Sequence, residues 1–184
     1  MIPVTRKVPP EKKLIKLPDK LVEEIDRRAL GIYSSRSEFL NEAIHTFARD
    51  RILADRKLAA KYKRTYKGNG ATAETIRMSR ANLWKLSMKL SRYESDDYTP
   101  VTAYITAHQL EIIRTCFLFK DGPLKTLQDF ARLAAVMQLE AIDEEEEHMA
   151  FMEDRWTLEV ASIFKEQMDA FKAKQRKSED RDSS

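Results

Sequence analysis

Three side chains near the start of the chain alternate in a way that would gather them on one face of an extended strand. Lys12, Leu14 and Lys16 occupy every second position of the segment KKLIKL, and the positions between them include Ile15 and Leu17. Successive side chains of a strand point to opposite faces, so the first three would face away from a buried core. Lysine suits the guanine acceptors of the major groove, and leucine suits the thymine methyl group. These three residues are therefore candidates for reading base edges of double-stranded DNA.

A second group of candidates stands where a helix is expected to begin. Ser35 is followed three residues later by Glu38, which is the pattern of a capping box. The N-terminus of a helix presents unpaired backbone amides and the positive end of the helix dipole, and both attract phosphate. We expect Ser35, Arg36 and Ser37 to hold a phosphate of the DNA backbone.

One strand and two helices must position these groups. Pro18 ends the strand because proline has no N–H for a ladder. The apolar residues that follow recur at helical spacing, first at Leu21, Val22, Ile25 and Ala29, and after Gly31 again at Phe39, Leu40, Ala43, Ile44 and Phe47. A lone strand leaves its backbone groups unpaired, and a second copy of the same unit is the simplest source of a partner. The expectation is a homodimer with an antiparallel two-stranded ribbon, which fits the major groove.

The stretch 12–47 resembles the ribbon-helix-helix family of DNA-binding regulators, of the Arc, MetJ and CopG type. The resemblance rests on the alternating strand closed by Leu17-Pro18, on the LVEEID helix and on YSSRSEF at the start of the second helix. It implies a sequence-specific transcriptional regulator of the repressor kind. Two alternatives stay open: an antitoxin whose C-terminal part wraps a toxin, and an architectural or partition protein that coats DNA.

A second unit of the same kind is expected within residues 74–122. In the favoured interpretation its strand lies at 75–79, with Thr75, Arg77 and Ser79 facing DNA. Thr99-Pro100 and the run DGP at 121–123 then bracket one long helix. Two units in one chain allow two arrangements: they can pair with each other, or each can pair with its twin in a second copy. The differing charge of the two units, and the long insert between them, favour the second arrangement.

A rival interpretation places the second strand later. Its strand runs over 101–105, its helices cover about 107–119 and 124–140, and Phe130 takes the place of Phe39. The first interpretation is preferred because a five-residue strand led by a proline has weaker local support.

The expected fold class is mostly α, and Gly68, Asn69 and Gly70 mark the main boundary. The expected segments are a flexible basic arm at 1–11, a DNA-binding domain with a helical extension at 12–66, a linker at 67–73, the second unit at 74–122, a helical segment at 123–174 and a disordered tail at 175–184. A row of apolar residues from Met152 to Phe171 could serve as an oligomer contact, and residues 123–171 could bind a protein partner.

Charge is distributed unevenly along the chain. Residues 1–66 carry 16 Lys and Arg against 9 Asp and Glu, whereas residues 123–184 carry 9 against 15. The basic end therefore suits a polyanion such as DNA.

Several other classes of protein find no support. The three histidines are far apart and the single Cys116 has no CxxC partner, so neither a metal site nor a cofactor is expected. No phosphate loop or nucleophile elbow is present, so the chain is not expected to be an enzyme. No long uncharged apolar run indicates a membrane span, and the lone cysteine fits a reducing cytoplasm in which the protein would associate with the nucleoid.

Overall fold

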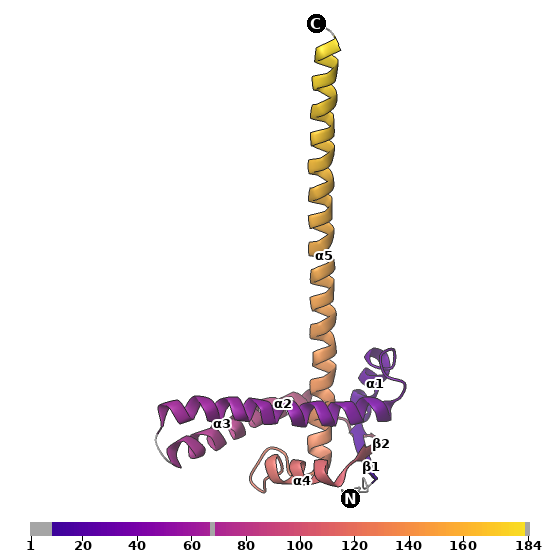
Figure 1. Ribbon diagram of the computed structural model, residues 1–184. Helices are drawn as coiled ribbons and strands as arrows, with labels where there is room; N and C mark the ends of the chain where they lie inside the picture. The colour runs from indigo at the N-terminus through magenta and orange to yellow at the C-terminus, as the bar shows by residue number, and fades with distance from the viewer. Residues whose placement is uncertain (1–8, 67–68, 183–184) are drawn as a thin grey trace, which may run out of the picture. The chain divides into compact units, whose positions relative to one another are not determined.

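The computed structural model describes residues 9–66 and 69–182; for residues 69, 158, 161, 164 and 166–182 it describes the course of the helix alone. The described chain is mostly helical, as the sequence predicts, and its described residues contain one two-stranded antiparallel sheet. Its elements in order are β1 (Glu11–Pro18), α1 (Asp19–Arg28), α2 (Arg36–Thr65), α3 (Asn69–Ser87), the 3-10 helix η1 (Met88–Tyr93), β2 (Tyr98–Ile105), α4 (Ala107–Cys116) and α5 (Leu127–Asp182) (Figure 1).

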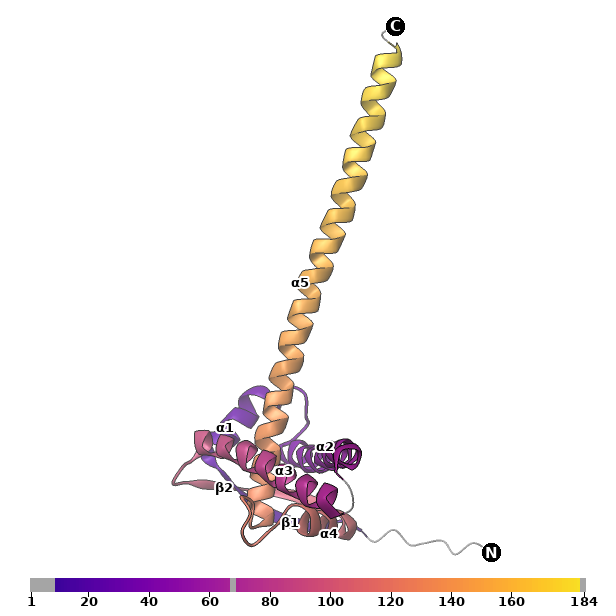
Figure 2. The ribbon, with the colours of Figure 1, turned by 90° about the vertical axis from the view of Figure 1, so that its left-hand side faces the viewer.

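The chain divides into two compact units, Met1–Ala141 and Ile142–Ser184. The first unit holds both strands, the helices from α1 to α4 and the beginning of α5, and the second consists of the rest of α5 (Figure 2). The sequence predicts that the helical segment ends at residue 174 and that a disordered tail follows at 175–184. In the structure, α5 continues to Asp182.

The partner of β1 is a strand of the same chain. β1 pairs antiparallel with β2, in a register that runs from Glu11 opposite Ile105 to Pro18 opposite Tyr98. The expectation that the strand pairs across a dimer is therefore wrong. A partner within the chain costs only loop closure, whereas a second copy costs the freedom of a whole molecule.

The second strand is not where the favoured interpretation put it. Thr75, Arg77 and Ser79 lie inside helix α3, and the hydroxyl of Thr75 donates to the carbonyl of Ala71 at 2.7 Å, as in a continuous helix. Good helix formers such as alanine, glutamate, arginine and methionine fill this segment, so a short alternation does not overcome their preference. The rival strand at 101–105 is present within β2, and helices follow it as that interpretation required.

Pro100 fits inside β2 because the ribbon has only two strands. The amide N–H of Tyr104 donates to Oδ1 of Asn41 on α2, so it points off the free edge of the strand. Backbone groups alternate in direction along a strand, and Pro100 stands four residues before Tyr104. The N–H that proline lacks would therefore also point off the free edge, and no ladder bond is lost.

One face of the ribbon forms part of the core of the first unit. Its buried residues come from both strands, with Ile15 and Leu17 on β1 and Val101, Ala103 and Ile105 on β2. Phe39 of α2 and Phe130 of α5 are both completely buried against this core. The ring of Phe130 stacks on Phe117 at a centroid distance of 5.2 Å and tilts against Phe47 at 5.3 Å.

Helix α2 runs well past the core, and α3 packs against it (Figure 1). Arg51 is buried where they meet; it donates to Asp55 at 3.2 Å, and the hydroxyl of Ser79 donates to the same carboxylate at 2.9 Å. The linker expected at 67–73 is thus largely replaced by helix from Asn69 onward. Residues 67–68 lie outside the described residues, as do residues 1–8 of the expected arm.

Candidate nucleic-acid interface

The solvent-facing side of the ribbon brings together six residues from the two strands. Burial alternates along β1, so Lys12, Leu14 and Lys16 are exposed, as the sequence predicts. The register places three residues of β2 directly opposite them: Tyr104 opposite Lys12, Thr102 opposite Leu14 and Pro100 opposite Lys16. We call these six residues the outer ribbon face.

The outer ribbon face combines two cations with hydroxyl and apolar groups. Leu14 is 59% exposed and Tyr104 is 48% exposed, so both side chains are accessible to a ligand. Lysine ammonium groups donate, the hydroxyls of threonine and tyrosine both donate and accept, and the methyl groups of Leu14 and Thr102 can contact a thymine methyl. The surface therefore offers each kind of contact that base edges of the major groove accept.

The lysines of the outer ribbon face are available for a ligand. Within the described part of the chain, no ion pair involves Lys12 or Lys16. Lys13, between them, belongs to the other set of alternating positions and forms an ion pair with Glu11 at 2.6 Å. Two neighbouring cations without acidic partners favour an anionic ligand.

Both free edges of the ribbon are fixed by helices. Asn41 of α2 accepts from the amide of Tyr104 at 2.8 Å, and Nε of Arg132 on α5 donates to the carbonyl of Lys16 at 3.0 Å. The guanidinium of Arg132 also lies 4.9 Å from the centre of the Tyr98 ring. These contacts hold the backbone of the ribbon, so its outer side chains are presented from a rigid support.

The start of α2 has the predicted cap, but Arg36 is engaged. Ser35 accepts from the amide of Glu38 at 3.2 Å, and the carboxylate of Glu38 accepts from the amide of Ser34 at 2.8 Å. Arg36 forms two hydrogen bonds to Asp26 of α1, one of them 2.7 Å long. The Arg36 guanidinium lowers the pKa of Asp26, and the hydrogen bonds from Ser34 lower the pKa of Glu38.

The start of α5 repeats this arrangement. The amide of Asp129 donates to the hydroxyl of Thr126 at 3.2 Å, and the carboxylate of Asp129 accepts from the amide of Thr126 at 3.0 Å. The first amides of both helices, at 36–37 and 127–128, have no carbonyl within the helix to accept them. Both helix starts can therefore receive an anion, whereas sequence reasoning identified only the start of α2.

Three predicted residues do not join the outer ribbon face. Arg77 is held by Glu74 through two hydrogen bonds of 2.6 and 2.9 Å, and Thr75 and Ser79 make the helical contacts described above. Conversely, Pro100, Thr102 and Tyr104 were missed as site residues. The signal that could have found them is the alternation in YTPVTAYI, where Val101, Ala103 and Ile105 mark the buried face.

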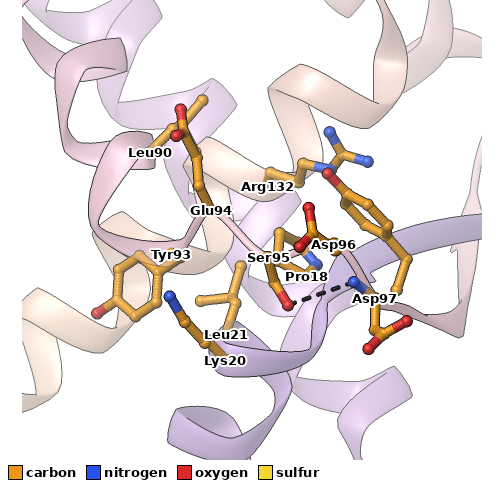
Figure 3. A pocket seen from close by; sticks show the side chains of 11 residues that line it. Pro18, Lys20, Leu21, Leu90, Tyr93, Glu94, Ser95, Asp96, Asp97 and Arg132 are labelled. Carbon is orange, nitrogen blue, oxygen red and sulfur yellow. Dashed lines mark hydrogen bonds between the residues drawn. The ribbon is translucent and has the colours of Figure 1, made fainter.

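Cavities open on the part of the first unit that the structure describes, and two of them differ in size. The larger, of about 680 Å³, lies at the end of the ribbon where Pro18 meets Tyr98, and its rim mixes the cations Lys20 and Arg132 with three carboxylates, Glu94, Asp96 and Asp97 (Figure 3). The smaller, of about 470 Å³, lies between α2 and α4. Neither cavity adjoins a metal-binding group, since no cluster of three His, Cys, Asp or Glu exists among the residues that the structure describes.

Comparisons with known proteins give no relative to set beside this site. No protein-family model, no curated protein and no solved structure matches the chain. The described residues also contain no helix long and apolar enough to cross a membrane.

Proposed function

We propose that this chain is a sequence-specific, double-stranded-DNA-binding transcriptional regulator of the ribbon-helix-helix type, in which a single chain supplies both units. The first unit is β1 with α1 and α2, and the second is β2 with α4 and the beginning of α5. The observation that carries the proposal is the outer ribbon face, a basic and hydroxyl-bearing surface on a two-stranded ribbon of the width that the major groove admits.

Several buried positions of the two units correspond at one constant spacing along the chain. α4 begins at Ala107, which is 88 residues after the start of α1 at Asp19. The same spacing of 88 residues relates Leu17 of β1 to Ile105 of β2. It also relates three further pairs of buried residues: Ile15 to Ala103, Ile25 to Ile113 and Ala29 to Phe117. A shared buried pattern is what two copies of one fold would need.

The pairing of the strands supports an internal twofold axis. By the same spacing, Leu14 corresponds to Thr102, and these two residues also stand opposite each other in the ribbon. A position that pairs with its own equivalent lies on the axis that exchanges the units. The contacts at the two edges of the ribbon agree with such an axis. Asn41 stands two residues after Phe39, and Arg132 stands two residues after Phe130. Each of these two side chains bonds to the strand of the other unit.

DNA recognition would follow from this geometry. The outer ribbon face would enter the major groove, with Lys12 and Lys16 donating to base acceptors and Leu14 near the axis meeting a thymine methyl. The starts of α2 and α5 would bind backbone phosphates on either side of the groove through their free amides. Such a regulator would act in the cytoplasm, on the nucleoid.

The two halves of the bound site should differ. The internal axis relates Lys16 to Tyr104 and Lys12 to Pro100, so equivalent positions offer different groups to the bases. A symmetric dimer would read the same bases twice, whereas this chain would read two different half-sites. The proposed operator is therefore not a palindrome.

A genome-wide binding map of the tagged protein, followed by affinity measurements on the recovered site, tests the proposal. Lys16→Ala should weaken binding to that site by about 1–3 kcal/mol and weaken binding to random DNA less, because a base contact is lost. Lys13→Ala is the matched control, since it removes the same charge from the same strand on the other set of positions. Unchanged DNA affinity in a Lys12→Ala, Lys16→Ala double variant would refute the proposal.

A further inference from the structure

The compact unit Ile142–Ser184, which consists of the later part of α5, carries a row of exposed apolar side chains. Met149, Met152, Trp156, Val160 and Ile163 stand three or four residues apart on α5, and each is between 38% and 67% exposed. At 100° per residue these steps keep them on one face of the helix. We call this row the α5 stripe. A contiguous apolar row of this length on a helix indicates a surface that another element covers.

Apolar residues lie at matching distances on both sides of Val160, except that the counterpart of Ile163 is Thr157. Apolar residues stand four positions from Val160 at Trp156 and Phe164, and eight positions from it at Met152 and Met168. Met149 and Phe171 follow at eleven positions. Apolar residues at these matching distances can meet their counterparts in a copy of the helix that runs the opposite way.

The charges outside the row have the complementary arrangement. Glutamates occupy all four positions of 144–147, before the row, and basic residues Lys172, Lys174, Arg176 and Lys177 follow it. Two copies running in opposite directions about Val160 would place each acidic run beside the basic run of its partner. Two copies running in the same direction would place the acidic runs side by side, where they repel.

From this stripe and these charges we propose that residues 144–177 form an antiparallel two-helix coiled coil with a second copy of the same chain, centred on Val160. Each contact buries apolar surface that one helix leaves in water, and a helix gains most of its stability from such packing. The proposal stands apart from the proposed DNA binding, since it uses other residues. The resulting dimer would carry two complete ribbons and could hold two DNA sites at once.

Sedimentation equilibrium of the full chain tests the contact. The protein should be a dimer, and Trp156→Glu or Val160→Glu should weaken dimerisation by about tenfold or more, since a charge would enter the seam. Phe151→Glu is the matched control: Phe151 is as exposed as Met149, at 63%, but two residues along the helix place it on the opposite face. A second control, Trp84→Glu on α3, removes an exposed tryptophan from the compact unit Met1–Ala141. A monomeric wild-type protein, or equal losses in the control variants, would overturn the proposal.

Disulfide trapping tests the direction of pairing. In a Cys116→Ser background, Met149→Cys and Phe171→Cys proteins should each stay reduced alone and should form mixed dimers when combined under oxidising conditions. A disulfide between two copies of the Met149→Cys protein would show parallel helices, and no disulfide in the mixture would show that these positions do not meet. Either result would overturn the antiparallel arrangement. Dimerisation that weakens as salt rises is expected because salt screens the attraction between the acidic and the basic run.

Discussion

The two strands pair with each other in one ribbon, and they are similar on the buried face but not on the outer face. The buried positions are apolar in both strands, whereas the outer positions are Lys12, Leu14 and Lys16 on β1 but Pro100, Thr102 and Tyr104 on β2. Packing against the core restricts the inner face, because a polar group there would be buried without a partner. Nothing in the fold restricts the outer face in this way. Under the proposed function, specificity for DNA would therefore come from this difference between the strands.

The starts of the two long helices differ in the same manner. Both have a capping hydroxyl and an acidic residue three positions later, because the free amides of the first turn need acceptors. The first helical residue is Arg36 in α2 and Leu127 in α5. Only the first of these can form an ion pair, and it does so with Asp26.

Truncating the two equivalent core rings should have the largest effect. Phe39→Ala and Phe130→Ala should each lower the free energy of unfolding by about 3–5 kcal/mol, because a large ring leaves a cavity. Phe130 contacts two aromatic rings, at 5.2 and 5.3 Å, whereas Phe39 contacts the edge of Tyr33 alone among the rings of the described chain. We therefore expect the loss to be greater at Phe130, measured as urea unfolding of both variants. A tolerated Phe130→Ala beside a damaging Phe39→Ala would mean that the second unit is not built like the first.

A smaller effect is expected where the outer residues differ. Tyr104→Phe keeps the ring and removes only the hydroxyl, so binding to the recovered DNA site should weaken by about 0.5–1.5 kcal/mol. In the proposed complex Tyr104 contacts one half of the DNA site, and Lys16 takes the corresponding position on the other half. The loss should therefore be seen only with DNA in which the half contacted by Tyr104 is intact. Affinity measured on DNA variants mutated in one half at a time gives this comparison. Tyr98→Phe, at the end of the same strand, is the control, and an equal loss there would argue against a specific contact.

Local patterns in the sequence suffice for the first unit. The alternation around Ile15, the stop at Pro18 and the cap at Ser35 each depend on neighbouring residues, so the order of strand and helices could be predicted and is found. The exposure of Lys12, Leu14 and Lys16 follows from the same alternation. Their contact with DNA stays a prediction.

The second strand could not be chosen from local patterns. Residues 75–79 and 101–105 both alternate, and Pro100 counts against the second segment when only its own sequence is considered. The choice depends on contacts far apart in the chain: Asn41 with Tyr104, Arg132 with Lys16, and the burial of Phe130. For the same reason the β2 half of the outer ribbon face was missed, and a partner from a second copy was expected where the chain supplies its own.

The smallest expected effect concerns the ion pair between Arg36 and Asp26 at the start of α2, where α5 has Leu127 in place of the arginine. Asp26→Asn should cost only about 0.2–1 kcal/mol of stability, because the side chains of Asp26 and Arg36 are 34% and 41% exposed and water screens the pair. Arg36 lowers the pKa of Asp26, so the stabilisation is present above the pKa of the unfolded chain and disappears as the pH falls through the lowered value. The difference between the two proteins should therefore vanish in acid, as urea unfolding at several pH values can show.

The same substitution would also release Arg36 beside the free amides of α2. If a phosphate binds there, the freed guanidinium should neutralise it, and the slope of log affinity against log salt should steepen by about 0.9. Glu24→Gln is the control, since it breaks the pairs of Glu24 with Arg27 at 2.6 Å and with Arg28 at 3.4 Å on α1 and leaves Arg36 held by Asp26. A slope that stays the same in Asp26→Asn would remove Arg36 from the phosphate contacts. The two helix starts would then bind DNA alike, through backbone amides alone, and the asymmetry of recognition would lie wholly in the outer ribbon face.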